Sequence, residues 1–252
     1  MRDIQTEIQK KLDEMAEAEH VKILHCVESG SRAWGFPSPD SDYDVRFIYL
    51  RSRDDYLKLG PQRDVIEWQL DDVYDISGWD VQKLLRLLYK SNPTVFEWSA
   101  SPIVYRTSPE WARISAVIPS YFRVKTGMHH YLSMAEGTRR AYLLGDTVRL
   151  KKYFYVLRPI LACRWIADRR TPPPMLFSEL AEAELDAEMQ PVVAELLARK
   201  QVTSELGTAQ PIAPLHAYIE RQLAELKQIA DHMEALPHPG WSALDDVFRS
   251  LL

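Results

Sequence analysis

Two aspartates separated by a single residue, Asp42 and Asp44, open a run of β-branched and aromatic residues, YDVRFIYL, which predicts a buried strand. Side chains two positions apart on a strand project from the same face, with Cα atoms about 6.6 Å apart. Two carboxylates at this spacing repel each other unless a cation lies between them. A pair of Mg²⁺ ions about 3.5–4 Å apart is the usual solution in phosphoryl transfer. The pattern therefore predicts a magnesium site that handles phosphate.

A glycine-serine pair stands shortly before these aspartates and could supply the other half of such a site. Gly30 and Ser31 follow the apolar run VKILHCVES, a second predicted strand, and introduce a short turn or helix start, SRAWGF. Glycine lets the backbone approach a phosphate closely, and amides at a helix start favour anions. The Ser31 hydroxyl can donate to a phosphate oxygen. A lone Gly-Ser pair is ordinary loop chemistry, so this prediction depends on the aspartates that follow.

The composition limits the class of protein. The chain has 252 residues, of which 46% are hydrophobic, enough for one large or two modest domains with a real core. Cys26 and Cys163 form no metal-ligand or disulfide pattern, so we expect a reducing, cytoplasmic setting. No apolar run approaches the roughly 20 residues that span a bilayer, and the charged N-terminal residues lack the apolar region of a secretory signal. We expect no membrane association, and no obligate protein partner is evident.

Strand and helix patterns alternate up to about residue 107, and only helix patterns follow. Strands are predicted within residues 21–29, 43–50, 63–70 and 73–79, with helices at 3–19 and 80–90 and a short extended or mixed segment at 94–105. Further helices are predicted at 110–118, 121–143, 148–168, 176–200 and 213–235. We therefore predict an α+β fold with a catalytic domain at residues 1–107 and an all-α domain at residues 108–252.

The stretch GSRAWGFPSPDSDYDVRFIY resembles the signature of the polymerase-beta-like nucleotidyltransferase superfamily. Together with DISGWDVQKLLRLLYKSNPTVFEW and KKYFYVLRPILACRWI, it is similar to a bacterial family of stand-alone nucleotidyltransferases suspected of a role in RNA repair. The resemblance implies a small mixed sheet with flanking helices, a metal site on adjacent strands, and a helical C-terminal domain that closes the nucleotide pocket. Carried over by position, Gly30 and Ser31 would hold the triphosphate, and Asp42 and Asp44 would bind Mg²⁺.

The superfamily also uses a third carboxylate on a neighbouring strand, which touches the metal and helps to deprotonate the attacking hydroxyl. Asp71 and Asp72 lie where a hairpin turn is expected, and Asp80 precedes a leucine-rich helix as an N-cap. Asp75 lies inside a predicted strand, where an ionised carboxylate needs a partner. We therefore favour Asp75 over Asp80 as the third metal ligand. The alternative is an ion pair between Asp75 and an arginine such as Arg46.

A basic helix in the second half of the chain is the remaining candidate. Residues 121–170 hold 11 basic and 3 acidic side chains, which indicates a local site for a polyanion. The resemblance points to a lysine and an arginine of the segment LKKYFYVLRPILACRWI as contacts of the nucleotide phosphates. We expect these to be Lys152 and Arg158, with an exposed basic helix face as the alternative.

These observations predict a Mg²⁺-dependent nucleotidyltransferase. An acceptor hydroxyl would attack the α-phosphate of an NTP, and pyrophosphate would leave. RNA 3′ ends, proteins and small hydroxylated molecules all fit as acceptors. A nucleotide-binding or partner-binding module without turnover is the alternative from another functional class, and a phosphate-ester hydrolase is a third.

Overall fold

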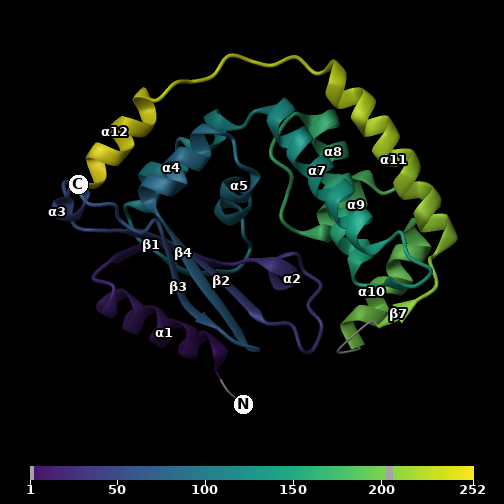
Figure 1. Cartoon of the computed structure of the whole chain (residues 1–252), viewed down its shortest axis with the longest axis horizontal. Helices are drawn as coiled ribbons and strands as arrows, with labels where there is room; N and C mark the ends of the chain where they lie inside the picture. Colours follow the sequence, from purple (N-terminus) through teal and green to yellow (C-terminus); the bar gives the residue numbers. More distant parts are fainter. Residues whose placement is uncertain (1–2, 203–206) are drawn as a thin grey trace. The chain divides into compact units, whose positions relative to one another are not determined.

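The computed structural model describes residues 3–202 and 207–252, and the chain folds into two compact units (Figure 1). We call them the sheet unit and the helical unit. The sheet unit comprises Met1–Ala33, Asp42–Tyr121 and His238–Leu252, and the helical unit comprises Trp34–Ser41 and Phe122–Pro237. The predicted domain boundary between residues 107 and 108 stays a prediction.

A five-stranded mixed sheet with strand order β3-β4-β2-β1-β5 forms the centre of the sheet unit. The interior strands β2 (Tyr43–Leu50) and β4 (Tyr74–Asp80) run parallel to each other. The other pairs, formed by β1 (Lys22–Glu28), β3 (Val65–Leu70) and β5 (Val104–Thr107) with their neighbours, are antiparallel. The chain leaves β2 through the short helix α3 (Arg53–Tyr56) and forms the edge strand β3 before it returns as β4.

One face of the sheet is buried against α1 (Ile4–Ala18). Val45 and Phe47 of β2 lie in one buried cluster with Leu12 of α1. Because side chains alternate along a strand, Asp44 projects from the opposite face. Along β2, the apolar side chains of Val45 and Phe47 therefore face α1, and the acidic side chain of Asp44 lies on the other face of the sheet.

Two further helices follow the strands and begin at side-chain caps. Asp80 caps α4 (Val81–Tyr89) by accepting from the backbone N of Gln82 at 2.7 Å. Asn92 caps α5 (Pro93–Ser99), whose first residue is proline. Helix α4 packs on β2 and β4, and Figure 1 shows it on the side of the sheet opposite α1.

The last residues of the chain also belong to the sheet unit. Helix α12 (Ser242–Leu251) packs against α4, and the Trp241 ring stacks on Tyr89 with centroids 3.6 Å apart. The remaining short helices of this unit are α2 (Gly30–Ala33), α6 (Trp111–Ser115) and the 3-10 helix η1 (Ile118–Tyr121).

The helical unit is organised around a pair of long helices, α7 (Val124–Tyr142) and α8 (Lys152–Arg169), which pack together along their buried faces. The other described elements are α9 (Phe177–Glu184), α10 (Gln190–Val202), α11 (Ala213–His232) and a small antiparallel sheet of β6 (Val148–Arg149) with β7 (Thr208–Ala209). Of the helices in the described residues, none combines the length and apolar character that crossing a membrane requires.

The α+β fold class is confirmed, and three local expectations differ from the structure. Residues 93–99 form helix α5 where an extended or mixed segment was expected, because Asn92 and Pro93 supply a helix start. The single helix expected at 176–200 is two helices, since α9 ends at Glu184 and the next residue, Leu185, has an extended backbone. Helix α12 was not predicted.

Gly78 on β4 tests the packing of this sheet. It pairs in register with Phe47, and an added Cβ would lie 2.3 Å from the Phe47 ring. We expect Gly78→Ala to lower the free energy of unfolding by about 1–3 kcal/mol through overpacking. Urea denaturation followed by circular dichroism would measure this. Gly60→Ala, at an exposed position with nothing within 4 Å, is the control. Equal stability of the two variants would contradict the packing described here.

Candidate active site

The parallel pairing of β2 with β4 places two of the three predicted carboxylates side by side. Asp44 pairs in register with Asp75, so both side chains project from the same face of the sheet. The tyrosines one position earlier on each strand, Tyr43 and Tyr74, pair in the same way on the other face, with ring centroids 5.9 Å apart. The register therefore places Asp44, the second aspartate of the strand motif, beside Asp75, which was favoured as the third carboxylate.

Gly30 lies directly against the Asp44 carboxylate. A Cβ at position 30 would stand 1.9 Å from Asp44 Oδ2, and Gly30 has a φ of +57°, in the left-handed region. The backbone N of Ser29 donates to Asp44 O at 2.8 Å, which fixes the turn to the strand. Gly30 thus leaves space that any side chain would fill. Ser31 follows in α2, the helix start expected from the sequence.

Asp42 stands one residue before β2 and is exposed. The chain around it is held by Arg32, whose Nε donates to Asp42 O at 2.9 Å and whose guanidinium lies 3.8 Å from the centre of the Tyr43 ring. Arg32 brings a positive charge to the Gly-Ser turn, and the sequence analysis did not single it out. Asp42, Asp44 and Gly30 therefore belong to one local arrangement within the sheet unit.

Asp44 is unusually basic for an aspartate. Burial raises the pKa of Asp44 to about 6, the Arg46 guanidinium opposes this shift, and the negative charges of Asp42 and Asp75 add to it. A carboxylate whose ionised form is disfavoured in this way gains most from a nearby cation.

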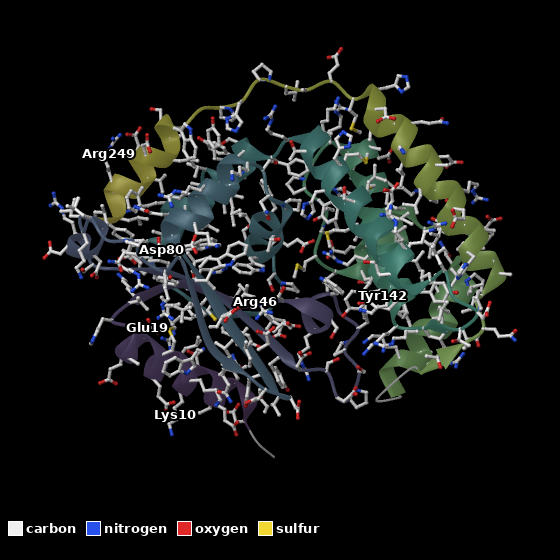
Figure 2. All side chains as sticks on the ribbon, viewed as in Figure 1. Lys10, Glu19, Arg46, Asp80, Tyr142 and Arg249 are labelled. Carbon is white, nitrogen blue, oxygen red and sulfur yellow. The ribbon has the colours of Figure 1, made fainter. Side chains whose placement is uncertain are left out.

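Arg46, which is labelled in Figure 2, forms ion pairs with both carboxylates. Its Nη2 donates to Asp75 Oδ2 at 2.6 Å and to Asp44 Oδ1 at 3.0 Å, and its Nη1 donates to Asp75 O at 2.6 Å. The ion pair between Asp75 and Arg46, which the sequence analysis kept as an alternative, is therefore present. The Arg46 guanidinium thus occupies a position between Asp44 and Asp75 at which we expected a metal cation.

The chemistry of these donors fits a divalent cation. Carboxylate oxygens are the ligands that Mg²⁺ prefers; Asp44 Oδ2 faces the space left by Gly30, and the positive guanidinium shows that the carboxylate pair attracts a cation. Among the described residues, no three or more His, Cys, Asp or Glu side chains are already grouped closely enough to hold a metal ion.

Glu28 is a buried carboxylate beside the site that the sequence analysis missed. Its Oε1 accepts from the backbone N of Asp44 at 2.9 Å, and the Tyr105 hydroxyl donates to its Oε2. Burial raises the pKa of Glu28 to about 7, against the effect of both hydrogen bonds. The signal in the sequence was an acidic residue at the end of an apolar strand, next to the Gly-Ser pair.

The other acidic candidates have structural roles. Asp71 Oδ1 accepts from the backbone N atoms of Val73 and Tyr74 at 2.8 and 2.7 Å, which is the turn chemistry expected of it. Asp80 is the expected N-cap of α4 and also accepts from the Tyr56 hydroxyl at 3.0 Å. Asp80 pairs with Tyr49, five residues further along the strands than the Asp44 and Asp75 pair.

Lys152 and Arg158 lie on α8 of the helical unit. Lys152 Nζ lies over the rings of Tyr142 and Tyr155, 4.2 and 4.7 Å from their centres, and burial together with nearby cations lowers its pKa. Arg158 is 1% exposed, with its guanidinium 4.8 Å from the centre of the Trp34 ring and its Nη2 donating to Met175 O at 3.4 Å. Their role as phosphate contacts stays a prediction.

Glu28 gives a prediction about pH. Because the folded protein holds the Glu28 proton up to a pKa of about 7 and the unfolded chain releases it near 4.5, this group stabilises the fold at low pH and loses that contribution as pH rises through about 7. Glu28→Gln, which cannot ionise, should therefore gain stability relative to the wild type between pH 4 and 8, by up to about 3 kcal/mol.

Urea denaturation at several pH values would measure the difference. Glu67→Gln, at an exposed glutamate of β3, is the control and should follow the wild-type profile. A Glu28→Gln profile that runs parallel to that of the wild type would contradict the burial of an ionisable group at this position.

Comparisons with known proteins identify the family of the chain. The model of the RlaP family, the RNA repair pathway DNA polymerase beta family, matches residues 4–250. The chain is 44% identical over 236 residues to the uncharacterized protein YcgL of Bacillus subtilis (strain 168), with 90% of this chain and 89% of that protein covered.

A crystal structure of a nucleotidyltransferase-like protein from Exiguobacterium sibiricum 255-15 is 14% identical, with a TM-score of 0.33 over 98% of this chain and 80% of that one, a likeness too weak to carry an argument. The family match spans both the sheet unit with its aspartates and the helical unit with α8. The chain therefore belongs to the RNA repair pathway DNA polymerase beta family.

Proposed function

We propose that this protein transfers a nucleoside monophosphate from an NTP to an acceptor hydroxyl and releases pyrophosphate. The observation that carries the proposal is the in-register pairing of Asp44 with Asp75 beside the Gly30 turn. This pairing supports a site in which carboxylates on interior strands of the sheet lie next to a turn that could bind phosphate. Membership of a polymerase-beta-like nucleotidyltransferase family supports nucleotidyl transfer in general.

Asp42 and Asp44 would hold Mg²⁺, and Asp75 would complete the site. Bound there, Mg²⁺ would neutralise the charge that develops on the phosphate oxygens during transfer. Asp44 presents one oxygen to the Gly30 turn and the other to Arg46, while Asp75 stands next to it on β4. Asp75 is thereby close enough to the site to help remove the proton from the attacking hydroxyl.

The triphosphate would lie against the turn at Gly30 and Ser31. Gly30 leaves room for a phosphate close to the backbone, and the Ser31 hydroxyl would donate to a phosphate oxygen. From the sequence, we also propose Lys152 and Arg158 of α8, in the helical unit, as residues that bind phosphate. The half-buried Lys152, held over two tyrosine rings, is the better supported of the two, because Arg158 is 1% exposed.

We propose an RNA hydroxyl as the acceptor. The description of the family as part of an RNA repair pathway supports this choice, and so does the excess of basic residues between positions 121 and 170. Two buried, free cysteines are consistent with the reducing, cytoplasmic setting that such a function implies.

Replacement of the paired aspartates tests the proposed function. Asp44→Asn and Asp75→Asn should each lower the transfer of label from an α-labelled NTP to RNA by about 10²-fold or more, because a charge that stabilises the transition state is lost. All four NTPs should be assayed against RNA, protein and small-molecule acceptors. Asp72→Asn, at an exposed aspartate of the β3–β4 turn, is the control and should retain activity. Transfer that survives the double change Asp42→Ala with Asp44→Ala would refute this mechanism.

Gly30→Ala tests the space at the turn separately from the charges. The new Cβ would collide with Asp44 Oδ2, so we expect weaker binding of NTP and at least about tenfold slower transfer. Gly240→Ala is the matched control, because Gly240 also has a positive φ, +84°, but nothing lies within 4 Å of its added Cβ. Binding measured by calorimetry and transfer measured with label should separate the two variants. If Gly240→Ala lost as much NTP binding and transfer activity as Gly30→Ala, the effect would come from backbone strain and not from the space beside Asp44.

A further inference from the structure

The guanidinium of Arg46 makes an unusual set of contacts for a residue of a magnesium site. A single nitrogen, Nη2, donates to carboxylate oxygens of Asp44 and Asp75, which belong to different strands. A position shared by carboxylate oxygens of two strands is one that a divalent cation would occupy, because such oxygens are its preferred ligands. Arg46 therefore makes the contacts that one of two metal ions would make.

Arg46 is anchored at this position by the backbone as well as by charge. Its Nη1 donates to Asp75 O at 2.6 Å and to Val45 O at 3.2 Å, and its side chain is 16% exposed. Both carbonyl groups belong to interior strands of the sheet. If a metal ion took this position, the guanidinium would lose its hydrogen bonds to two carbonyl oxygens and to two carboxylates at the same time.

The donors that Arg46 leaves available suffice for one ion. Asp44 Oδ2 faces the Gly30 turn, and Asp42 is exposed at the start of β2. The formal charges of Asp42, Asp44, Asp75 and Arg46 sum to −2, so Arg46 supplies part of the positive charge that the three aspartates require. Three aspartates alone would carry −3.

We propose that Arg46 is a resident cation of the site, so that the protein binds one divalent ion with its nucleotide instead of two. This rests on the proposed function and changes the expectation of a two-ion site. The ion is held by Asp42 and Asp44 together with the nucleotide phosphates. Arg46 keeps Asp44 and Asp75 together and supplies the positive charge that a second ion supplies elsewhere.

Counting bound ions tests this. Mn²⁺ would be titrated into the whole protein in the presence of an α,β-methylene NTP, a nucleotide that cannot react, with the protein in excess so that the nucleotide is bound. Electron paramagnetic resonance reports the number of bound Mn²⁺ ions and the magnetic coupling between ions a few ångströms apart. We expect one ion per bound nucleotide and no coupling in the wild type.

Arg46→Met, which removes the charge but keeps a long side chain, should bind two Mn²⁺ ions with coupling between them. Arg46→Lys keeps the charge and should bind one. Arg53→Met, at an exposed arginine of the sheet unit, is the control and should also bind one.

The outcomes separate the two proposals. Two coupled ions in the wild type would overturn the role of Arg46 while leaving nucleotidyl transfer in place, and this measurement needs no variant to fold. One ion in both the wild type and Arg46→Met would also overturn it. The absence of any bound ion in the wild type would refute the proposed function itself, and with it this inference.

Discussion

The parallel register between β2 and β4 is the constraint on which the candidate site depends. Asp44 meets Asp75 because the two strands pair residue for residue from Tyr43 and Tyr74 onward. A slip of one residue would turn Asp75 toward the face that packs on α1, where burial of an unpaired carboxylate is costly. The same slip would bring Tyr74, now packed on that face, out of its cluster. The apolar core on one face of the sheet and the charged site on the other therefore fix each other.

The site is built on interior strands and is supported from behind by a buried carboxylate. Glu28 at the end of β1 accepts from the backbone of Asp44, and Tyr105 of β5 donates to Glu28. Through these two hydrogen bonds, β1 and β5 help to set the position of a residue on β2. Side chains on paired strands are held more precisely than side chains on loops. The exposed Asp42, just outside β2, is the least constrained of the three predicted ligands.

Local patterns in the sequence were sufficient to predict the fold class and four of the five strands of the central sheet, but not every contact in the site. Alternation of side chains along residues 43–50 placed Asp44 and Val45 on opposite faces, and the N-cap role of Asp80 followed from its position before a leucine-rich helix. The contact between Glu28 and Asp44 depends on the antiparallel pairing of β1 with β2, which no local pattern specifies. Helix α12 packs on α4, and its apolar residues Leu244, Val247, Phe248 and Leu251 recur at helical spacing, so periodicity was sufficient to predict this helix although it was not among the predicted elements.

The order of charges along β2 explains how carboxylates can be kept close together in a folded protein. Asp44 and Arg46 stand two positions apart on β2 and so share one face, on which Asp75 is added by the neighbouring strand, and Asp42 directly precedes β2. Without a cation, repulsion among the aspartates would favour separation of β2 from β4 where their pairing begins. Arg46 offsets that repulsion with a charge that belongs to the chain and does not depend on the concentration of free metal. A site built in this way can be folded before nucleotide arrives, with its remaining negative charge directed to the ion that accompanies the nucleotide.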